Sequence, residues 1–574
     1  MPIFDIFGSS RQTYIISLGI FYLLPFSLSL GAVASQLVRD SKYLVFWGTA
    51  FLSLLVPATA APTLRGLPDT GSATLICLAI FIYIKQFYFK QHHARSTFIS
   101  TVLSLFGLGV LLGSSIVFRR HFAYSVASFL AAMIVFEGIP ALKQGKRAIL
   151  AVGLRVATVA TSALLTLGIL TPTFVLDSLT RNYRSIYSSF SFPIADVIQY
   201  YGTAFGLLLW GLAIWGWWML WPWKIARFPL LFGLFEILLW LGFLRYNHVH
   251  YTLHFTSFVV WGLVGIYNVK SKISKKNILI WACLSLNAII GLTGLIQNFP
   301  GFAKGFPPLF RRDYAEISRL VTTLRELPQP IYVAASSDLL NPEILVSAEK
   351  KLYPDNLKLS VLRIPQVDSS DDYPLAKLLE AQTVVVPNSF QYNLQPQAQD
   401  VVRVVYTIFS ENWDVVTDFQ PLQMRFLLDG TTVQLYQRVK STNLETAVKT
   451  IEKMQRSIEP RYEKHSEWVS VSPGVKIEKI DRSHRLSGPL PISLLWMSPI
   501  VEAREISGEI TGCQGVRSIV EFRNTRGTIS STQSLSISEN GRFSDTVTPS
   551  ENHNYVTLAV AGNPKCHVML VLTD

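Results

Sequence analysis

The polar residues best suited to chemistry in the first 300 residues form four clusters, each standing between apolar stretches. They are TLRGLPDTG around Asp69, FRRHFAY around Arg119, RNYRSIYSSFSFP around Tyr187, and RYNHVHYTLHF around His250. Guanidinium and imidazole groups bind anionic oxygens, and ionisable groups at membrane depth are costly without a partner. Four such clusters on one face predict a wet cavity for an anionic group. The alternative for any single cluster is an interfacial anchor, in which arginines reach lipid head groups and aromatic rings lie at the membrane surface.

The apolar stretches between these clusters are long enough to cross about 30 Å of hydrocarbon. We expect about nine to ten spans, because several stretches are short or bounded by proline. The ten stretches are Thr13 to Val33, Tyr43 to Ala61, Gly71 to Tyr88, Phe98 to Val117, Phe122 to Phe136, Ile149 to Leu170, Ala204 to Trp221, Phe228 to Phe243, Leu253 to Tyr267 and Ile278 to Ile296. Residues 1–300 are therefore predicted to form a polytopic α-helical membrane domain. This excludes a cytosolic enzyme, a secreted disulfide scaffold and a disordered protein.

Charge is distributed unevenly along the chain. Residues 1–300 hold 22 Lys and Arg but only 7 Asp and Glu, whereas the remainder is close to neutral. The basic residues lie in short loops and form no continuous stripe, so a nucleic-acid partner is not expected. They instead predict the orientation of the chain, because cytoplasmic loops are enriched in Lys and Arg.

The loops between the ten stretches alternate in basic content. The odd-numbered loops carry 14 Lys and Arg, and the N-terminus with the even-numbered loops carries seven. We therefore expect the odd loops in the cytoplasm, and the even loops with the C-terminal half on the outer face. One uncertainty concerns Tyr43 to Ala61, which contains Pro57 and either crosses the membrane or lies along its surface. The clusters at Arg119, Tyr187 and His250 face outward in either case.

After Pro307 the sequence pattern changes and predicts alternating helices and strands. We expect helices over 311–327, 341–353, 374–379 and 398–410, and strands at PIYVAAS, LKLSVLRI, TVVVP, DVVTDF, MRFLL and TVQLYQRV. Asn341 and Pro342 are typical of a helix start, and LDGTT is typical of a hairpin turn. Residues 307–440 are predicted to be an extracytoplasmic α/β domain. It has neither a GxGxxG nor a GxxxxGK motif, so nucleotide binding is unsupported.

Residues 441–490 are predicted to be a helical and irregular linker, and residues 491–574 a small β-sandwich-like domain. That domain holds Cys513 and Cys566, whereas Cys77 and Cys283 lie in apolar stretches. Two cysteines in one small outer domain favour a disulfide in an oxidising compartment. The alternative is two unpaired thiols.

Several of these sequences point to one family. LRGLPD, RRHFAY, YVAASSDLLNPEIL and VVPNSFQYNLQPQAQDVV resemble sequences of poorly characterised bacterial membrane proteins. Those proteins are placed among the polytopic GT-C-type glycosyltransferases, which include lipid-linked aminoarabinose transferases and protein O-mannosyltransferases. The resemblance spans about residues 40–440, and its motifs are diffuse. The acidic pair typical of the family's first outer loop is not visible here, where only single acids occur.

The resemblance implies transfer of a sugar from a polyprenyl phosphate or diphosphate to an acceptor. Such a step needs a carboxylate as general base. Asp69 is the first candidate, because it follows Arg65 in an outer loop just before an apolar stretch. Its alternative role is to cap the next helix. Asp40 is the reserve candidate, since it lies outside only if Tyr43 to Ala61 does not cross.

The departing phosphate needs cations or hydrogen-bond donors, and adjacent arginines are suited to it. Arg119 and Arg120 lead this set, and the alternative for them is contact with lipid head groups. The remaining candidates are Arg65, Arg184, Tyr187, Arg245, His248 and His250. His250 and His254 share a helix face if the segment is helical, but without a nearby carboxylate or cysteine no metal site is expected.

The predicted function is therefore a membrane glycosyltransferase at the outer face of a bacterial plasma membrane. Its partners are a polyprenyl-phosphate-linked sugar, a lipid, glycan or protein acceptor, and membrane lipids. No cofactor is required by the sequence, although a divalent cation is compatible with it. The alternative is a non-catalytic scaffold or assembly subunit that binds a partner through its outer domains. A transporter is a third reading, but no inverted repeat is apparent and intramembrane charge is sparse.

Overall fold

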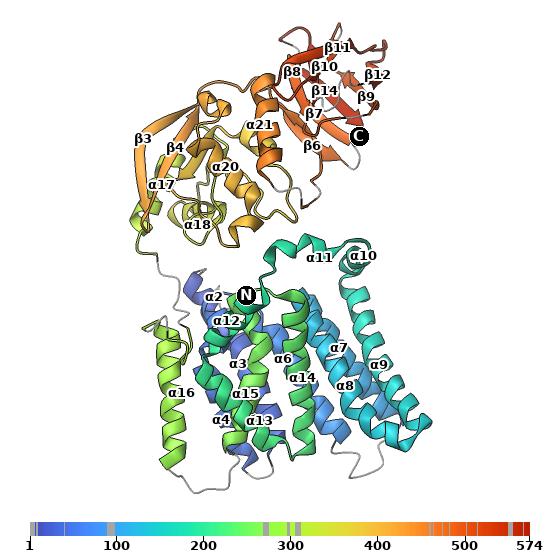
Figure 1. Ribbon diagram of the computed structural model, residues 1–574, viewed down its shortest axis with the longest axis vertical. Coiled ribbons are helices and arrows are strands. Elements are labelled where there is room, and N and C mark those ends of the chain that lie inside the picture. Colours follow the sequence, from blue (N-terminus) through green and yellow to red (C-terminus); the bar gives the residue numbers. More distant parts are fainter. Residues whose placement is uncertain are drawn as a thin grey trace. The chain divides into compact units, whose positions relative to one another are not determined.

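The computed structural model forms two compact units, which are described separately (Figure 1). The first comprises residues 1–183 and 190–310, and the second comprises residues 184–189 and 311–574. The residues that the structure describes are 6, 8, 10–38, 41–88, 98–267, 275–295, 299–304, 311–458, 461–462, 464–472, 474–480, 483–500, 502–513, 515–548, 555–565 and 567–573.

The first unit is entirely helical in its regular structure. Its helices are α2 (Arg11–Leu18), η1 (Gly19–Leu23), α3 (Leu24–Gln36), α4 (Lys42–Leu55), α5 (Pro57–Leu64), α6 (Thr70–Tyr83), η2 (Ile84–Tyr88), α7 (Phe98–Phe118), η4 (Arg120–Phe122), α8 (Ala123–Gln144), α9 (Lys146–Leu170), α10 (Pro172–Thr180), α12 (Ile194–Phe205), α13 (Leu207–Leu220), η6 (Lys224–Ala226), α14 (Arg227–Leu239), η7 (Trp240–Leu244), η8 (Val249–Thr252), α15 (Leu253–Tyr267) and α16 (Lys275–Thr293). The short α11 (Tyr183–Ile186) and η5 (Ser188–Phe190) each contain a position in the sequence where one unit ends and the other begins.

Where the structure describes them, the ten apolar stretches are largely helical, which confirms a polytopic helical membrane domain. Among the described residues, six helices are long and apolar enough to cross a membrane, and the number rises to eight if each bent pair is one span. Two further apolar helices, Thr70–Gln86 and Trp281–Thr293, are shorter. The nine to ten spans expected thus become six to eight by length, because several helices are broken or short.

The two bent pairs explain why some predicted spans are not simple rods. The α4 and α5 helices meet at 62° where Pro57 begins α5, and α12 meets α13 at 86° across Gly206. Proline cannot donate the backbone hydrogen bond that would continue α4, and Gly206 has a φ of 83°, which favours glycine. The stretch Tyr43 to Ala61 is thus a broken span or re-entrant segment. Its second arm, α5, leads directly into the loop that holds Asp69.

The second unit begins with a four-stranded sheet covered by helices (Figure 1). The strand order is β1-β2-β4-β3, with β1 parallel to β2 and the other pairs antiparallel. The strands are β1 (Ile331–Val333), β2 (Thr383–Pro387), β3 (Phe419–Leu428) and β4 (Thr431–Arg438), and the helices are α17 (Tyr314–Leu324), α18 (Pro342–Leu352), α19 (Leu375–Glu380), η9 (Pro396–Ala398), α20 (Asp400–Ser410) and η10 (Asp414–Asp418). This is the α/β architecture that the alternating pattern predicted.

Two predictions from short sequence motifs in this domain, a helix start and a hairpin turn, are confirmed. The Asn341 side chain accepts a hydrogen bond from the Ile344 backbone N–H and begins α18. Asp429 and Gly430, with φ values of 43° and 87°, form the turn between β3 and β4. Two positive φ angles are the requirement of a tight hairpin turn that matches the twist of its strands.

Two predicted strands of this domain are not regular strands. The LKLSVLRI segment contributes only an isolated bridge between Val361 and Ile331, and DVVTDF forms η10 before β3 begins at Phe419. Both segments have strand-like composition. Whether such a segment pairs along its length depends on a neighbouring strand, which composition does not report.

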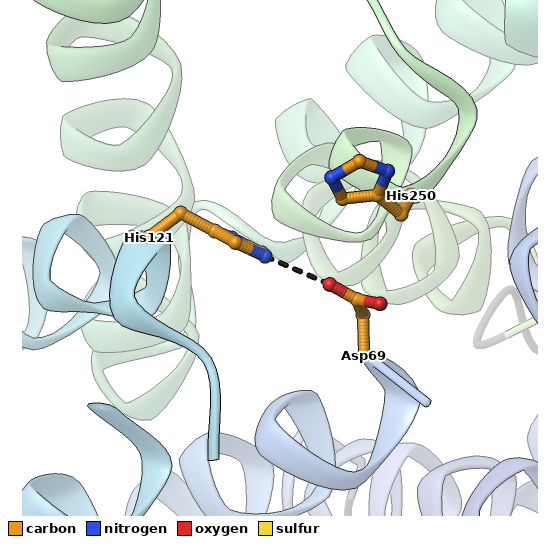
Figure 2. A group of neighbouring side chains, drawn as sticks. All are labelled: Asp69, His121 and His250. Atoms are coloured by element: carbon orange, nitrogen blue, oxygen red, sulfur yellow. Dashed lines mark hydrogen bonds and ion pairs between the residues drawn. The ribbon is translucent and has the colours of Figure 1, made fainter. Parts of the chain in front are cut away.

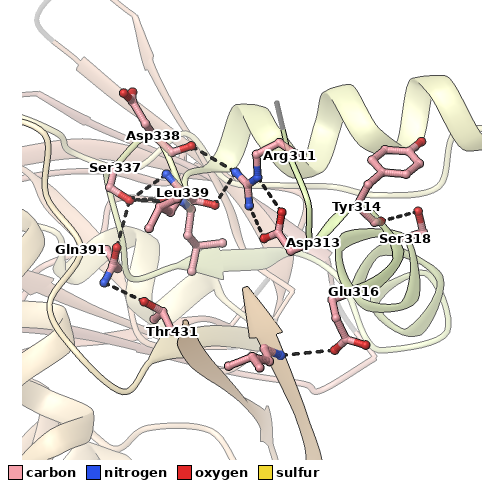
Figure 3. Close-up of polar contacts among 12 residues, drawn as sticks. Arg311, Asp313, Tyr314, Glu316, Ser318, Ser337, Asp338, Leu339, Gln391 and Thr431 are labelled. Carbon is pink, nitrogen blue, oxygen red and sulfur yellow. Dashed lines mark hydrogen bonds and ion pairs between the residues drawn. The ribbon is translucent and has the colours of Figure 1, made fainter. Parts of the chain in front are cut away.

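The start of the α/β domain is held by a cluster of polar contacts (Figure 3). Arg311 forms an ion pair with Asp313, and the same guanidinium donates to the backbone carbonyls of Asp338 and Leu339. Ser337 in turn caps the Leu339 and Leu340 amides. These bonds join the segment before α17 to the loop that follows β1.

The end of the second unit is a β-sandwich of two five-stranded sheets, as predicted. The sheet orders are β11-β10-β13-β8-β5 and β12-β9-β14-β7-β6, and their inner faces share one apolar core. The strands are β5 (Trp468–Ser470), β6 (Lys476–Ile480), β7 (Ser483–Pro489), β8 (Ile492–Trp496), β9 (Arg504–Thr511), β10 (Arg517–Arg523), β11 (Ile529–Ser534), β12 (Arg542–Val547), β13 (Tyr555–Ala561) and β14 (His567–Thr573).

The linker predicted over residues 441–490 is only partly a linker. Its first part forms α21 (Leu444–Ser457), whose apolar face is buried against α20 and β8. Its second part supplies β5, β6 and β7 to the sandwich, where β7 pairs with the last strand of the chain. The β domain thus starts before residue 491, because pairing with strands about 80 residues away orders a segment that looks irregular in sequence.

The bonding state of the three described cysteines agrees with the prediction from the sequence. Cys513 is disulfide-bonded, whereas Cys77 and Cys283 are free. Cys566 lies outside the described residues, so its pairing with Cys513 stays a prediction. The Cys513 Sγ is 3.7 Å from the carbonyl oxygen of His567, the neighbour of Cys566.

Candidate active site

Asp69 lies in the short loop between α5 and α6 and is only 1% exposed. It stands at the position where a side chain would cap α6, yet among the described contacts it makes no cap hydrogen bond to that helix. The alternative in which Asp69 is simply a helix cap is therefore not what the structure shows. Its carboxylate is directed to side chains from other loops.

Two neighbours from the loop between α7 and α8 hold this carboxylate. The His121 Nε2 lies 2.8 Å from Asp69 Oδ1 (Figure 2). An Arg119 guanidinium nitrogen lies 3.2 Å from Asp69 Oδ2. Arg119 has an extended backbone at the end of α7, and η4 then turns His121 back toward Asp69. Each carboxylate oxygen thus faces a different basic side chain.

Behind His121 a chain of polar contacts runs into the helical core. The His121 Nδ1 is 2.8 Å from His254 Nε2, and His254 Nδ1 is 2.7 Å from Glu236 Oε1. Ser125 donates to the same Glu236 oxygen. Glu236 and His254 are 2% and 1% exposed, so these contacts replace water for both groups. The result is a continuous buried series: Asp69, His121, His254, Glu236.

His250 approaches Asp69 from a third loop, between η7 and α15 (Figure 2). One ligand atom from each of Asp69, His121 and His250 can be chosen so that all three lie within 4.8 Å of one another. The His250 Nδ1 is 2.6 Å from His248 Nδ1. The expectation of no nearby carboxylate is wrong, because folding brings Asp69 beside His250.

His250 and His254 lie in two different elements, which the i, i+4 spacing did not predict. His250 lies in η8, whereas His254 is in the first turn of α15, where Trp240 stacks on it at 4.4 Å between ring centres. Both histidines nevertheless lie against His121, with ring centres 5.6 and 5.0 Å from that ring.

The surroundings of Asp69 favour its charged form. Burial alone would raise its pKa, but a hydrogen bond with His121 and the positive potential from His250, His121 and Arg119 lower the pKa below its ordinary value. Asp69 is thus a carboxylate at neutral pH. That is the state a proton acceptor or a cation ligand must have.

The adjacent residues Arg119 and Arg120 contact different groups in the structure. Arg119 pairs with Asp69, whereas Arg120 is exposed and lies 5.2 Å from the ring centre of Phe174. The two guanidinium groups thus have different partners, and their shared role on one phosphate stays a prediction.

The other predicted phosphate ligands are spread over three places. Arg65 follows α5 and lies within electrostatic range of Tyr200, and Arg245 ends η7 in the left-handed conformation with φ 56°. The Nε atoms of Arg119 and Arg245 are buried and have no hydrogen-bond partner among the described residues. Arg184 and Tyr187 belong to the second unit. Asp40 lies outside the described residues.

A cavity of about 390 Å³ opens next to Arg119. It is mainly apolar and aromatic, with Arg119 as its charged side chain, and it borders Pro68 just before Asp69. Its walls are Tyr14, Ser17, Leu18, Phe21, Tyr22, Pro68, Phe118 and Arg119.

The sequence reasoning missed His121, Ser125 and Glu236 as members of the site. Glu236 had a usable signal, because it is one of seven acids in residues 1–300 and stands in the middle of an apolar stretch. His121 had a weaker signal, because it stands in the FRRHFAY cluster that the sequence singled out. Ser125 had none, since a serine near a span end is common.

Comparison with known proteins adds one structural likeness. No protein-family profile and no curated protein matches this sequence. Among solved structures, the chain is similar to ArnT from Cupriavidus metallidurans, crystallised with undecaprenyl phosphate. The identity is 12% and the TM-score 0.42, over 76% of this chain and 85% of that one. A likeness at this level carries no argument about the site, which rests on its own geometry.

Proposed function

We propose that this protein transfers a sugar from a polyprenyl phosphate or diphosphate donor to an acceptor at the outer face of a bacterial plasma membrane. The observation that carries the proposal is the buried Asp69 carboxylate, which caps no helix and instead meets Arg119 beside an apolar cavity. A base and a phosphate ligand side by side are what such a transfer needs.

Arg119 is the proposed ligand of the donor phosphate. Its side chain is 38% exposed and borders the cavity, and its buried Nε has no hydrogen-bond partner among the described residues. A guanidinium fork with a free edge is suited to phosphate oxygens. Turning this fork from Asp69 to the donor also exposes Asp69 Oδ2, the oxygen that would take the acceptor proton.

The cavity beside Arg119 is the proposed entrance for the lipid part of the donor. Its walls carry Leu18, Phe21, Tyr22 and Phe118, which suit an isoprenoid rather than a free sugar nucleotide. A single charged residue in the wall of a mainly apolar cavity matches a ligand with an apolar tail and an anionic head. The cavity is proposed to hold the part of the tail nearest the phosphate.

We expect Arg119→Gln to weaken binding of a polyprenyl phosphate by roughly 10- to 150-fold, since a charged hydrogen bond is worth roughly 1.5 to 3 kcal/mol. Arg120→Gln is the matched control. Arg120 is the neighbour of Arg119 in sequence, but its guanidinium lies over the Phe174 ring, so this variant should bind the lipid nearly as well as the unaltered protein. A radiolabelled polyprenyl phosphate, titrated against full-length protein in detergent, measures both. Equal losses in the two variants would contradict the assignment of Arg119.

The proposed orientation rests on the basic loops. The loops that hold Asp69, His121 and His250 are all even-numbered, and the structure brings them together. They share one end of the helical unit, as the alternation requires, and their low basic content assigns that end to the outside.

A reporter fused after Lys276 is expected to read cytoplasmic, and one fused after Lys440 extracytoplasmic. The physical reason is the ratio of 14 to seven basic residues between the two sets of loops. Paired alkaline phosphatase and green fluorescent protein fusions in bacteria make the measurement. Fluorescence after Lys440 would overturn the orientation and place the Asp69 site on the cytoplasmic side.

A further inference from the structure

We propose that Asp69, His121 and His250 bind a divalent transition-metal ion of the zinc class. The three side chains come from three different loops, yet their ligand atoms all lie within 4.8 Å of one another (Figure 2). The inference is independent of the proposed sugar transfer, because it concerns only these side chains and the ion.

The contacts behind His121 hold its ring in place. Asp69, His121, His254 and Glu236 make three successive contacts of 2.7 to 2.8 Å. His121 turns Nδ1 to His254 and Nε2 to Asp69, so the ring presents one nitrogen to the proposed ion.

The groups behind the ligands are arranged as metal sites require. A histidine that binds a metal usually gives its other ring N–H to an acceptor, which fixes its tautomer. His121 has that acceptor in His254, which Glu236 orients and Trp240 stacks upon. His250 contacts His248 through Nδ1, which leaves Nε2 on the side of Asp69 and His121.

The ligand set selects the class of metal. Two imidazoles and one carboxylate suit zinc and its neighbours, whereas magnesium and calcium prefer oxygen ligands only. Ligands about 2.1 Å from a tetrahedral ion lie about 3.4 Å apart. The distance between His121 Nε2 and Asp69 Oδ1 must therefore increase slightly from 2.8 Å. The ligand atom of His250 lies at most 4.8 Å from the other two ligand atoms, so it must move closer by no more than about 1.4 Å. Small rotations of side chains accomplish both.

Three protein ligands leave at least one position open for a further ligand. Arg119, on the other Asp69 oxygen, places a positive charge beside the ion. That charge opposes metal binding, so Arg119→Gln is expected to retain or strengthen it. A ligand variant and an Arg119 variant should thus move metal affinity in opposite directions, which general loss of structure cannot do.

The test is metal content of full-length protein purified through a non-histidine tag and dialysed after loading with Zn²⁺. We expect about one zinc per chain by mass spectrometry, and less than a fifth of that in His250→Ala. His465→Ala is the matched control, because His465 is 81% exposed and lies in the second unit. Mg²⁺ loaded in the same way should not be retained.

Cobalt provides a second measurement on the unaltered protein. Co²⁺ in a site with two histidines and a carboxylate should give visible absorption bands that saturate at one equivalent and disappear on adding Zn²⁺. This result does not depend on whether His250→Ala folds. Absence of both retained zinc and a cobalt spectrum would overturn the proposal. One zinc per chain in folded His250→Ala would also overturn it.

Discussion

Asp69→Asn is expected to reduce sugar transfer by roughly 10²- to 10⁴-fold, the contribution typical of a positioned general base. An amide cannot take the acceptor proton. It can, however, fill the same space, donate to His121 Nε2 and accept from Arg119, so the loop should keep its structure. Donor binding should change far less than turnover, because only the transition-state role is removed.

The measurement is transfer of a labelled sugar from its polyprenyl phosphate, with donor affinity determined on the same preparations. Asp177→Asn is the control, since Asp177 is a 44% exposed acid of the first unit that pairs only with Arg181 among the described ion pairs. Wild-type turnover in Asp69→Asn would remove Asp69 as the base. If the unaltered protein itself transfers no sugar from any polyprenyl donor, the scaffold interpretation gains instead.

The base and the metal ligand are separable in this experiment. His250→Ala removes a proposed metal ligand but leaves the Asp69 carboxylate in place. Asp69→Asn removes both roles. If His250→Ala loses zinc and keeps turnover, the ion is structural and the assignment of Asp69 as the base stands. If His250→Ala keeps zinc while Asp69→Asn loses turnover, the metal proposal fails and the assignment of the base does not.

Gly216→Val is expected to destabilise the helical unit by more than about 3 kcal/mol, beyond the usual cost of overpacking. A Cβ at Gly216 would lie 1.8 Å from the Gly262 carbonyl oxygen, and one at Gly265 would lie 2.0 Å from the Gly216 oxygen. The backbones of α13 and α15 are therefore in direct contact, as small residues permit in membrane helices. No side-chain rotation relieves such a clash.

The control is Gly211→Val, on the same helix, where a Cβ meets nothing within 4 Å. Thermal unfolding in detergent, followed by size-exclusion chromatography, should separate the two variants clearly. Since α15 carries His254, any Gly216→Val protein that folds should also lose site geometry. Equal melting temperatures for both variants would show that α13 and α15 are not as closely packed as the structure has them.

The sequence by itself determined features that depend on a few neighbouring residues. Hydropathy over about 20 residues located all ten apolar helices, because crossing hydrocarbon is a property of a segment. Asn341 and the Asp429–Gly430 turn were likewise predictable, since a cap and a hairpin turn are local geometry. By contrast, β7 lay hidden in a presumed linker, because its partner β14 is distant in sequence.

Only the tertiary structure decided the site. The sequence left Asp69 as either a base or a helix cap. In the structure its carboxylate makes no described cap hydrogen bond to α6 and instead contacts His121, 52 positions away, which contacts His254, a further 133 positions away. The sequence could not distinguish Arg119 from Arg120, since the direction of each side chain depends on the turn after α7. Glu236 looked like an isolated acid in an apolar helix. A buried charge is stable only beside its partners, and these come from other helices, so their identity is a property of the packed bundle.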